Sequence, residues 1–303
     1  MQNQIRTSHF TALAAMLLWG ISYIWMKSLF SFLQPATILV ARLLISGLFL
    51  FLLLLLTRKL ERIQKKHLPV FLLSAFFNPF LYFMGESHGL QRVSPTISAV
   101  IIATIPVFTP IFARIFLKEK LSKLNIFGIA VSFAGVLIML VTKDLSLTAD
   151  PAGIMMLFGA VASAIVYGIV LKKLTLLYRA LTIVWIQNLI GIFYFVPVAL
   201  YKEFESLQTF QFQVQIVMPI LLLGVFSSSL AFVFFTISVK NLGIARSNIY
   251  TNLIPVFTAI FSILVLSEMP DQKQWLGMGL VISGVVLSQR RITKTAILKK
   301  TLY

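Results

Sequence analysis

Residues 105–113 read IPVFTPIFA, and residues 254–262 read IPVFTAIFS. The two stretches lie 149 positions apart, and the alignment continues without a gap to 135 and 284, giving 11 identities in 31 positions. With small shifts in offset the match extends upstream, to Pro69 with Pro219, Trp19-Gly20 with Tyr167-Gly168, and Arg42 with Gln187. A repeat of this length indicates that the chain consists of two related halves.

The composition indicates a membrane protein. Of the 303 residues, 59% are hydrophobic and 12% are charged, whereas a soluble domain carries about a quarter charged residues. Each of ten apolar stretches is long enough for a spanning helix, and a strand of an outer-membrane barrel would be about half that length. The stretches are 7–26, 35–57, 68–85, 93–113, 124–142, 151–171, 180–201, 206–239 (with its helix beginning near Val217), 247–267 and 274–289.

The basic residues predict an orientation. If the N-terminus is cytoplasmic, 19 of the 26 Lys and Arg fall in cytoplasmic segments, 5 fall in outer loops, and Arg42 and Arg114 fall within helices. This bias is the one that cytoplasmic loops show. Both termini are therefore expected in the cytoplasm, and the net charge of +17 is attributed to contact with anionic lipid headgroups at that face rather than with nucleic acid.

The repeat and the orientation together predict the architecture. Ten helices give five in each half, and because five is odd the second half starts on the opposite side of the membrane. We expect an all-α polytopic fold with one repeat over 8–142, an inverted repeat over 151–289 and a basic cytoplasmic tail over 290–303. Inverted repeats are typical of secondary transporters, with the binding site where the halves meet, although channels also contain them.

The chain resembles the EamA type of the drug/metabolite transporter superfamily. The resemblance rests on Trp19-Gly20, on Arg42, and on a block that runs from Pro106 or Pro255 through Leu117-Glu119 or Leu266-Glu268 to glycines in the next helix. It implies a ten-helix transporter with a central cavity between the halves. Members of this family export amino acids and other metabolites, and relatives carry nucleotide sugars or drugs, so the resemblance implies a class and not a ligand.

Polar and aromatic side chains within the predicted helices are the candidate substrate-binding residues. They are Trp19, Tyr23, Arg42, Asn78, Tyr82, Tyr167, Gln187, Asn188, Asn248 and Asn252. Each amide can line a cavity or hold two helices together. Arg42 can bind an anionic group of a solute, or it can bond to backbone carbonyls at the outer end of the bundle. Pro106 and Pro255 are candidate hinges, because a proline inside a helix removes a backbone hydrogen bond, or they are kinks that shape packing alone.

The chain lacks the residues that several classes of function require. The chain has no cysteine, its three histidines (His9, His67 and His88) are dispersed, and it contains no nucleotide-binding loop or nucleophile triad. We therefore expect no metal, no cofactor and no enzymatic activity. Glu86 is expected near the outer mouth, which leaves no carboxylate in the middle of the membrane for a proton relay.

These observations predict a carrier in the inner (plasma) membrane that moves a small organic solute, an amino acid or related metabolite, by alternating access and in the direction of export. A channel-like facilitator is one alternative. A membrane-embedded enzyme acting on a lipid or prenyl substrate is another, and a scaffold that does not transport is a third. A homodimer is possible through the glycine faces of the fifth and tenth predicted helices.

Overall fold

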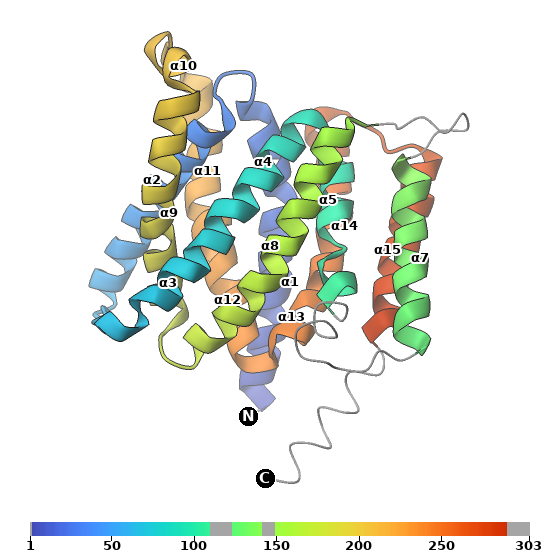
Figure 1. Cartoon of the computed structure of the whole chain (residues 1–303), viewed down its shortest axis with the longest axis horizontal. Helices are drawn as coiled ribbons and strands as arrows, with labels where there is room; N and C mark the ends of the chain where they lie inside the picture. Colours follow the sequence, from blue (N-terminus) through green and yellow to red (C-terminus); the bar gives the residue numbers. More distant parts are fainter. Residues whose placement is uncertain (1, 110–122, 141–148, 290–303) are drawn as a thin grey trace.

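The computed structural model describes residues 2–109, 123–140 and 149–289. Within these ranges the chain forms helices and no strands, as expected for a polytopic α-helical protein (Figure 1). Arg114, the Leu117-Glu119 motif and the predicted cytoplasmic tail over 290–303 lie outside the described residues.

Each of the ten predicted apolar stretches contains helix. Some stretches are divided into consecutive α-helical, 3₁₀-helical and π-helical segments. The elements are α1 (Gln2–Leu29), α2 (Pro35–Leu56), η1 (Lys65–His67), α3 (Leu68–Ala75), η2 (Phe76–Leu81), α4 (Tyr82–Arg92), α5 (Pro95–Ile102), α7 (Lys123–Leu140), α8 (Pro151–Thr175), α9 (Ala180–Lys202), α10 (Phe204–Gln208), η3 (Val214–Ile216), α11 (Val217–Leu222), η4 (Leu223–Ala231), α12 (Phe232–Leu242), α13 (Ile244–Ile249), η5 (Tyr250–Leu253), α14 (Ile254–Phe261), η6 (Ser262–Leu266) and α15 (Gln272–Gln289).

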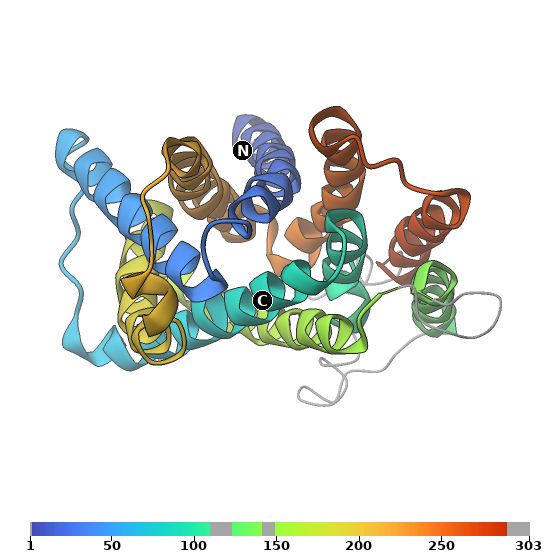
Figure 2. The same ribbon diagram turned by 90° about the horizontal axis from the view of Figure 1, so that it is seen from above.

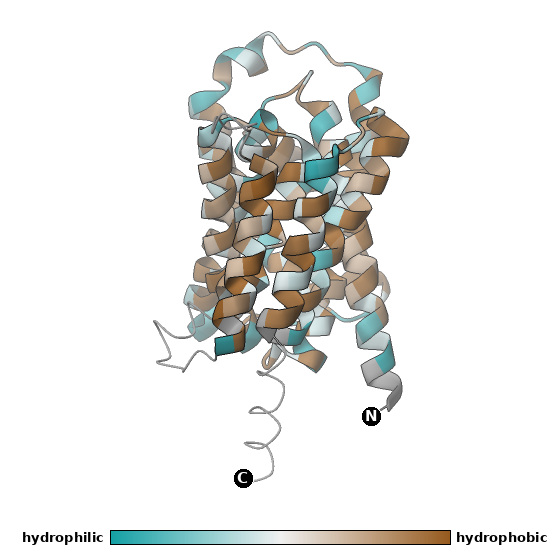
Figure 3. Ribbon diagram, turned by 90° about the vertical axis from the view of Figure 1, so that its right-hand side faces the viewer, coloured by the Kyte–Doolittle hydropathy of each residue, from teal (hydrophilic) through white to brown (hydrophobic). Residues whose placement is uncertain are grey.

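The outer surface of the bundle is apolar over most of its height. Seven helical segments in the described residues are long and apolar enough to cross a membrane, and Pro95–Thr109 and Ile126–Leu140 form shorter apolar helices. Large apolar side chains such as Leu56 and Phe193 are exposed on the helix flanks, where lipid replaces water as the solvent. Hydrophilic residues gather toward the two ends of the bundle (Figure 3).

Local sequence signals explain where several helices begin. Pro35, Pro95 and Pro151 each stand at the first turn of a helix, where the missing N–H has no intrahelical partner to lose. Asp150 caps α8 by accepting the backbone N–H of Ala152 at 2.8 Å and pairs with Arg92 at 2.8 Å. The Arg92 guanidinium and then this cap bond hold the pKa of Asp150 below its ordinary value.

The helices pack in a small number of close pairs. α2 lies along α9 at one end of the molecule, and α7 lies along α15 at the other end (Figures 1 and 2). Between these pairs, α4 packs on α8, α1 packs on α12, η4 and α14, and α5 packs on α14 and α8. The centre of the bundle is therefore enclosed by helices from both halves of the chain.

Glycines permit the closest of these pairs. A Cβ atom on Gly277 would lie 2.6 Å from the carbonyl oxygen of Gly135, and one on Gly284 would lie 2.6 Å from that of Gly128. Because these distances are too short for any side chain, the two backbones meet directly. The small faces predicted for these helices thus pack α7 on α15 within one chain, and no second copy of the chain is present to show a homodimer contact.

Four of the helical segments are interrupted near the middle of the bundle. At η2 the backbone of Asn78 is extended (φ −148°, ψ 119°), and η4 is π-helical in the corresponding segment of the second half. Residues 103–104 form a turn after α5, and η5 is a 3₁₀ turn before α14. Irregular backbone at membrane depth is tolerated where it is buried in protein or lines a cavity.

The candidate hinge prolines lie directly after two of these interruptions. Pro106 follows the turn at 103–104, and Pro255 stands in the first turn of α14. They were expected in the middle of continuous helices, each freeing a carbonyl. The structure instead places them where a helical segment restarts, a position that needs no N–H donor.

Candidate functional site

A cavity with about 640 Å³ of space not filled by atoms lies between the halves. Ten lining residues come from before residue 142 and ten from after residue 151. They are Trp19, Ser22, Tyr23, Arg42, Asn78, Tyr82, Phe83, Glu86, Ile102 and Ile105, and Ala164, Tyr167, Gly168, Ser227, Phe232, Phe235, Ile244, Asn248, Thr251 and Ile254.

The repeat relates many of these residues in pairs. The ungapped block pairs Ile105 with Ile254, and the same offset of 149 carried upstream of that block pairs Asn78 with Ser227, Phe83 with Phe232, Glu86 with Phe235 and Ile102 with Thr251. Both members of each pair line the cavity. Equivalent positions of the two halves therefore face the same space.

Arg42 is a buried cation on α2 in the wall of this cavity. Its Nε donates to Ser228 Oγ at 2.7 Å, and its Nη2 donates to Ser227 Oγ at 3.0 Å. The guanidinium carbon lies 4.4 Å from the centre of the Phe83 ring, a geometry that stabilises a cation. These partners are hydroxyls and a ring rather than the backbone carbonyls considered from sequence, and no carboxylate among the described residues contacts the guanidinium directly.

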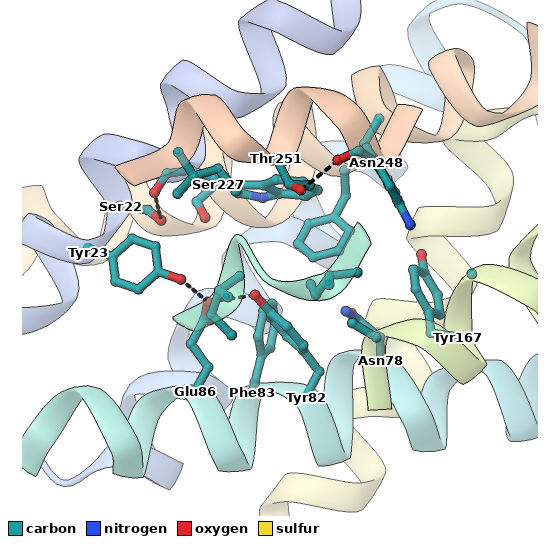
Figure 4. Close-up of a pocket in the computed structure, with 18 of the residues that line it drawn as sticks. Ser22, Tyr23, Asn78, Tyr82, Phe83, Glu86, Tyr167, Ser227, Asn248 and Thr251 are labelled. Carbon is teal, nitrogen blue, oxygen red and sulfur yellow. Dashed lines mark hydrogen bonds between the residues drawn. The ribbon is translucent and has the colours of Figure 1, made fainter. Parts of the chain in front are cut away.

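Glu86 is a carboxylate in the wall of the same cavity. Its Oε1 accepts hydrogen bonds from Tyr23 at 2.9 Å and from Tyr82 at 2.7 Å, and Figure 4 shows both hydroxyls directed at it. Glu86 was expected near the outer mouth and was not among the candidate binding residues, whereas the structure places it in the cavity wall. Hydropathy alone does not show which face of a helix lines a cavity.

The two charges face a shared space. A smaller hollow of about 220 Å³ is lined by Arg42 and Glu86 together with Tyr23 and four neighbouring residues. Neither charge is within ion-pair distance of the other, because Arg42 bonds to serines and Glu86 bonds to tyrosines. Two separated charges in a low-dielectric interior are stabilised when a ligand of complementary charge bridges them.

Two amides extend the polar part of the cavity. The amide of Asn248 points toward the Tyr167 hydroxyl, and the amide of Asn78 points into the cavity (Figure 4). Neither side chain hydrogen-bonds to another described residue. Much of the remaining wall is aromatic or aliphatic, and Trp19 contributes to it by packing on Phe232 and Phe235 at centroid distances of 5.0 and 5.2 Å. The cavity thus has a charged region, an amide region and an aromatic region.

Seven of the ten candidate binding residues line the cavity, and the other three do not. Gln187 lies behind the wall, where it accepts from Tyr167 at 3.4 Å and donates to Ser74 at 2.6 Å. Asn188 joins α9 to α2 and η4 by donating to Ser46 Oγ at 2.6 Å and to the Ser228 carbonyl at 3.1 Å. Asn252 is buried, and neither polar atom of its amide has a partner among the described residues.

The candidate hinge prolines, Pro106 and Pro255, do not line the cavity, but each is next to an isoleucine that does.

Sequence reasoning missed several residues that line the cavity, namely its serines, its phenylalanines and Glu86. The repeat contains a signal for part of this set, because adding the offset to the predicted residue Asn78 identifies Ser227. No cluster of three His, Asp or Glu suited to a metal occurs in the part of the chain that the structure describes.

Comparison with known proteins assigns the family. The EamA-like transporter family model matches twice, at residues 6–141 and 151–289. Similar proteins include the uncharacterised transporter YetK of Bacillus subtilis (26% identical, covering 82% of this chain and 76% of that protein) and an uncharacterised transporter of Archaeoglobus fulgidus (23%, covering 90% and 95%). A probable terminal-alkyne amino-acid exporter of Streptantibioticus cattleyicolor is 24% identical and covers 76% of each chain.

A solved crystal structure shares the fold. Its TM-score is 0.68 at 14% identity, over 93% of this chain and 98% of that one. The relatives are named as transporters rather than enzymes, and the resemblance noted in the sequence is confirmed by the family model. The chain is a multi-pass membrane protein that belongs to the EamA-like transporter family.

Proposed function

We propose that the chain is a secondary transporter that exports a small zwitterionic solute, an amino acid or a related metabolite, across the cytoplasmic membrane by alternating access. In this proposal ten helices form two inverted five-helix halves, 8–142 and 151–289, and both termini are cytoplasmic. The observation that carries the proposal is the cavity shared equally by the two halves, with Arg42 and Glu86 in its wall.

The helix contacts support the two-fold arrangement. In chain order, α1, α2, α4, α5 and α7 of the first half correspond to α8, α9, α12, α14 and α15 of the second. When each helix is exchanged with its counterpart, the contact α2–α9 maps onto itself, and so do the contacts α7–α15 and α5–α14. The pair α4–α8 maps onto the contact of α1 with α12 and η4, and both contacts are present. Inverted halves of this kind allow the bundle to open to one side and then to the other.

The charges of the cavity support the solute class. A carboxylate of a solute can bind the Arg42 guanidinium, while an ammonium group of the same solute replaces or joins the tyrosine hydroxyls at Glu86. Asn78 and Asn248 are available for further polar groups, and the ring of Trp19 is available for an apolar side chain. The relative named as an amino-acid exporter is consistent with such a ligand.

Counterflow in proteoliposomes tests this proposal with amino acids and two modified forms of each. The carboxamide lacks the anion and the N-acetyl derivative lacks the ammonium group. We expect each derivative to exchange at least about tenfold more slowly than the parent, because one buried charge then lacks its partner. Arg42→Gln should reduce the discrimination against the carboxamide, and Glu86→Gln should reduce it against the N-acetyl form.

Arg92→Gln and Glu205→Gln are matched controls, because these side chains lie outside the cavity and are exposed. Both should retain the parent's selectivity. Equal exchange of the parent and the N-acetyl form would exclude Glu86 as an ammonium site. If no amino acid or related metabolite exchanges in a broad panel, the carrier proposal itself is wrong.

A further inference from the structure

A glutamate from the second half caps a helix of the first half. Glu203 follows α9 and is buried against the start of α2. Its Oε1 accepts the backbone N–H of Ala36 at 2.8 Å, and its Oε2 accepts both the backbone N–H and the hydroxyl of Thr37, at 2.8 and 2.7 Å. The carboxylate thus satisfies donors that a helix N-terminus leaves free.

A glutamate from the first half caps a helix of the second half in the same way. Glu61 lies between α2 and η1, and its Oε2 accepts the backbone N–H of Arg179 at 3.0 Å and the hydroxyl of Thr182 at 2.5 Å. The Arg179 side chain approaches Glu61 Oε1 at 3.8 Å. We refer to these two arrangements as the Glu203 clamp and the Glu61 clamp.

The clamps are equivalent by the internal repeat and lie at opposite ends of the bundle. Thr37 is the third residue of α2, and Thr182 is the third residue of α9. They are 145 positions apart, as are Arg42 and Gln187. The Glu61 clamp lies at the end of the bundle where α1 begins, and the Glu203 clamp lies at the end near α10 (Figure 1). Each half therefore caps the N-terminus of the second helix of the other half.

Between the clamps, α2 and α9 form a continuous contact, which we call the α2–α9 seam. Leu39, Leu43 and Phe195 of these helices are fully buried in a hydrophobic cluster that continues into α4 and α12. Asn188 adds a hydrogen bond across it to Ser46. Arg42 is the only residue of these two helices that lines the cavity, among the residues the structure describes.

We propose that the α2–α9 seam is a fixed element that stays closed at both faces throughout transport, so that the halves rock about it. The proposal rests on the transport function proposed above. Opening the Glu203 clamp would leave a buried carboxylate and two backbone N–H donors of α2 without partners. Opening the Glu61 clamp would remove the partner of the Arg179 N–H and of the Thr182 hydroxyl. Motion that exposes the cavity alternately is then confined to the helices on the other side of the cavity, including α5 and α14.

Cross-linking tests this directly, because the chain has no natural cysteine. One variant carries Thr37→Cys with Glu203→Cys, and a second carries Glu61→Cys with Thr182→Cys, so that a short bifunctional thiol reagent replaces each clamp. We expect counterflow to remain within about twofold of the untreated variant after either cross-link or both. A cross-link between Ile105→Cys and Ile254→Cys, across the cavity, should abolish it. Loss of counterflow after either clamp cross-link would overturn the proposal.

Spin-label distances give a readout that does not depend on transport. Labels at Gln34 and Lys202 report on the Glu203 clamp, and labels at Arg58 and Leu177 report on the Glu61 clamp, since all four side chains are exposed. Each pair should give one narrow distance distribution in lipid, unchanged by solute. A second population at either pair would refute a fixed seam, whereas failure of every solute to exchange would refute the transport function alone.

Discussion

At the scale of single residues, three amides illustrate what sequence could and could not predict. Asn78, Asn188 and Asn252 were equally good candidates, because an amide in an apolar stretch is rare and must face something polar. Only Asn78 lines the cavity. A membrane helix is apolar on nearly every side, so no amphipathic pattern distinguishes the face toward the cavity from the face toward another helix.

Asn78 and Asn188 should therefore respond differently to the same substitution. Asn188→Leu removes the donor to Ser46 and the Ser228 carbonyl, and should lower the free energy of unfolding by about 1–3 kcal/mol. Asn78→Leu should leave stability nearly unchanged and lower solute exchange by about tenfold or more. Thermal unfolding in detergent and counterflow on the folded fraction measure the two effects. The reverse pattern would place Asn188, not Asn78, at the solute.

At the scale of helices, hydropathy predicted the segments well but not their interruptions. All ten apolar stretches contain helix, and α11 begins at Val217, as expected. The irregular segments η2, η4 and η5 were not predicted, because hydropathy averaged over a spanning stretch reports composition and not backbone geometry, even where the segment contains polar residues. These segments place Asn78, Ser227 and Thr251 in the cavity wall, so part of the site depends on backbone geometry that composition does not encode.

The close contact of α7 with α15 leads to a prediction with a control on the same helix. Gly277→Val places a side chain against Met139 and the Gly135 backbone, whereas a Cβ atom on Gly279 meets nothing within 4 Å. Gly277→Val should lower the free energy of unfolding by about 1–3 kcal/mol, and Gly279→Val should have little effect. Thermal unfolding of the purified variants distinguishes them. Equal stability would show that α7 and α15 separate readily in lipid.

At the scale of the whole molecule, the repeat predicted two related halves and the motifs around Trp19, Arg42 and the repeated proline block predicted the family, and the family model matches each half separately. Orientation rests on the positive residues alone. The charge pattern proposed for the solute was beyond sequence reasoning, because it rests on Arg42 and Glu86, and only folding brings these residues to one space.

Reporter fusions test the orientation. A fluorescent protein that folds only in the cytoplasm should be bright when fused after residue 303 or within 58–64, and dark when fused within 203–213. A periplasmic phosphatase should give the opposite pattern at each site. A bright fusion within 203–213 would place the Glu203 clamp at the cytoplasmic face and invert the proposed topology.

The paired lining of the cavity has a consequence for the direction of transport. In the proposed inverted arrangement, a cavity made only of like pairs, such as Phe83 with Phe232, would present the same chemistry to each side of the bilayer. The unlike pairs, Glu86 with Phe235 and Ile102 with Thr251, break that equivalence. Such unlike positions, together with Arg42 opposite Gln187 in the repeat, are where entry from one compartment can differ chemically from entry from the other.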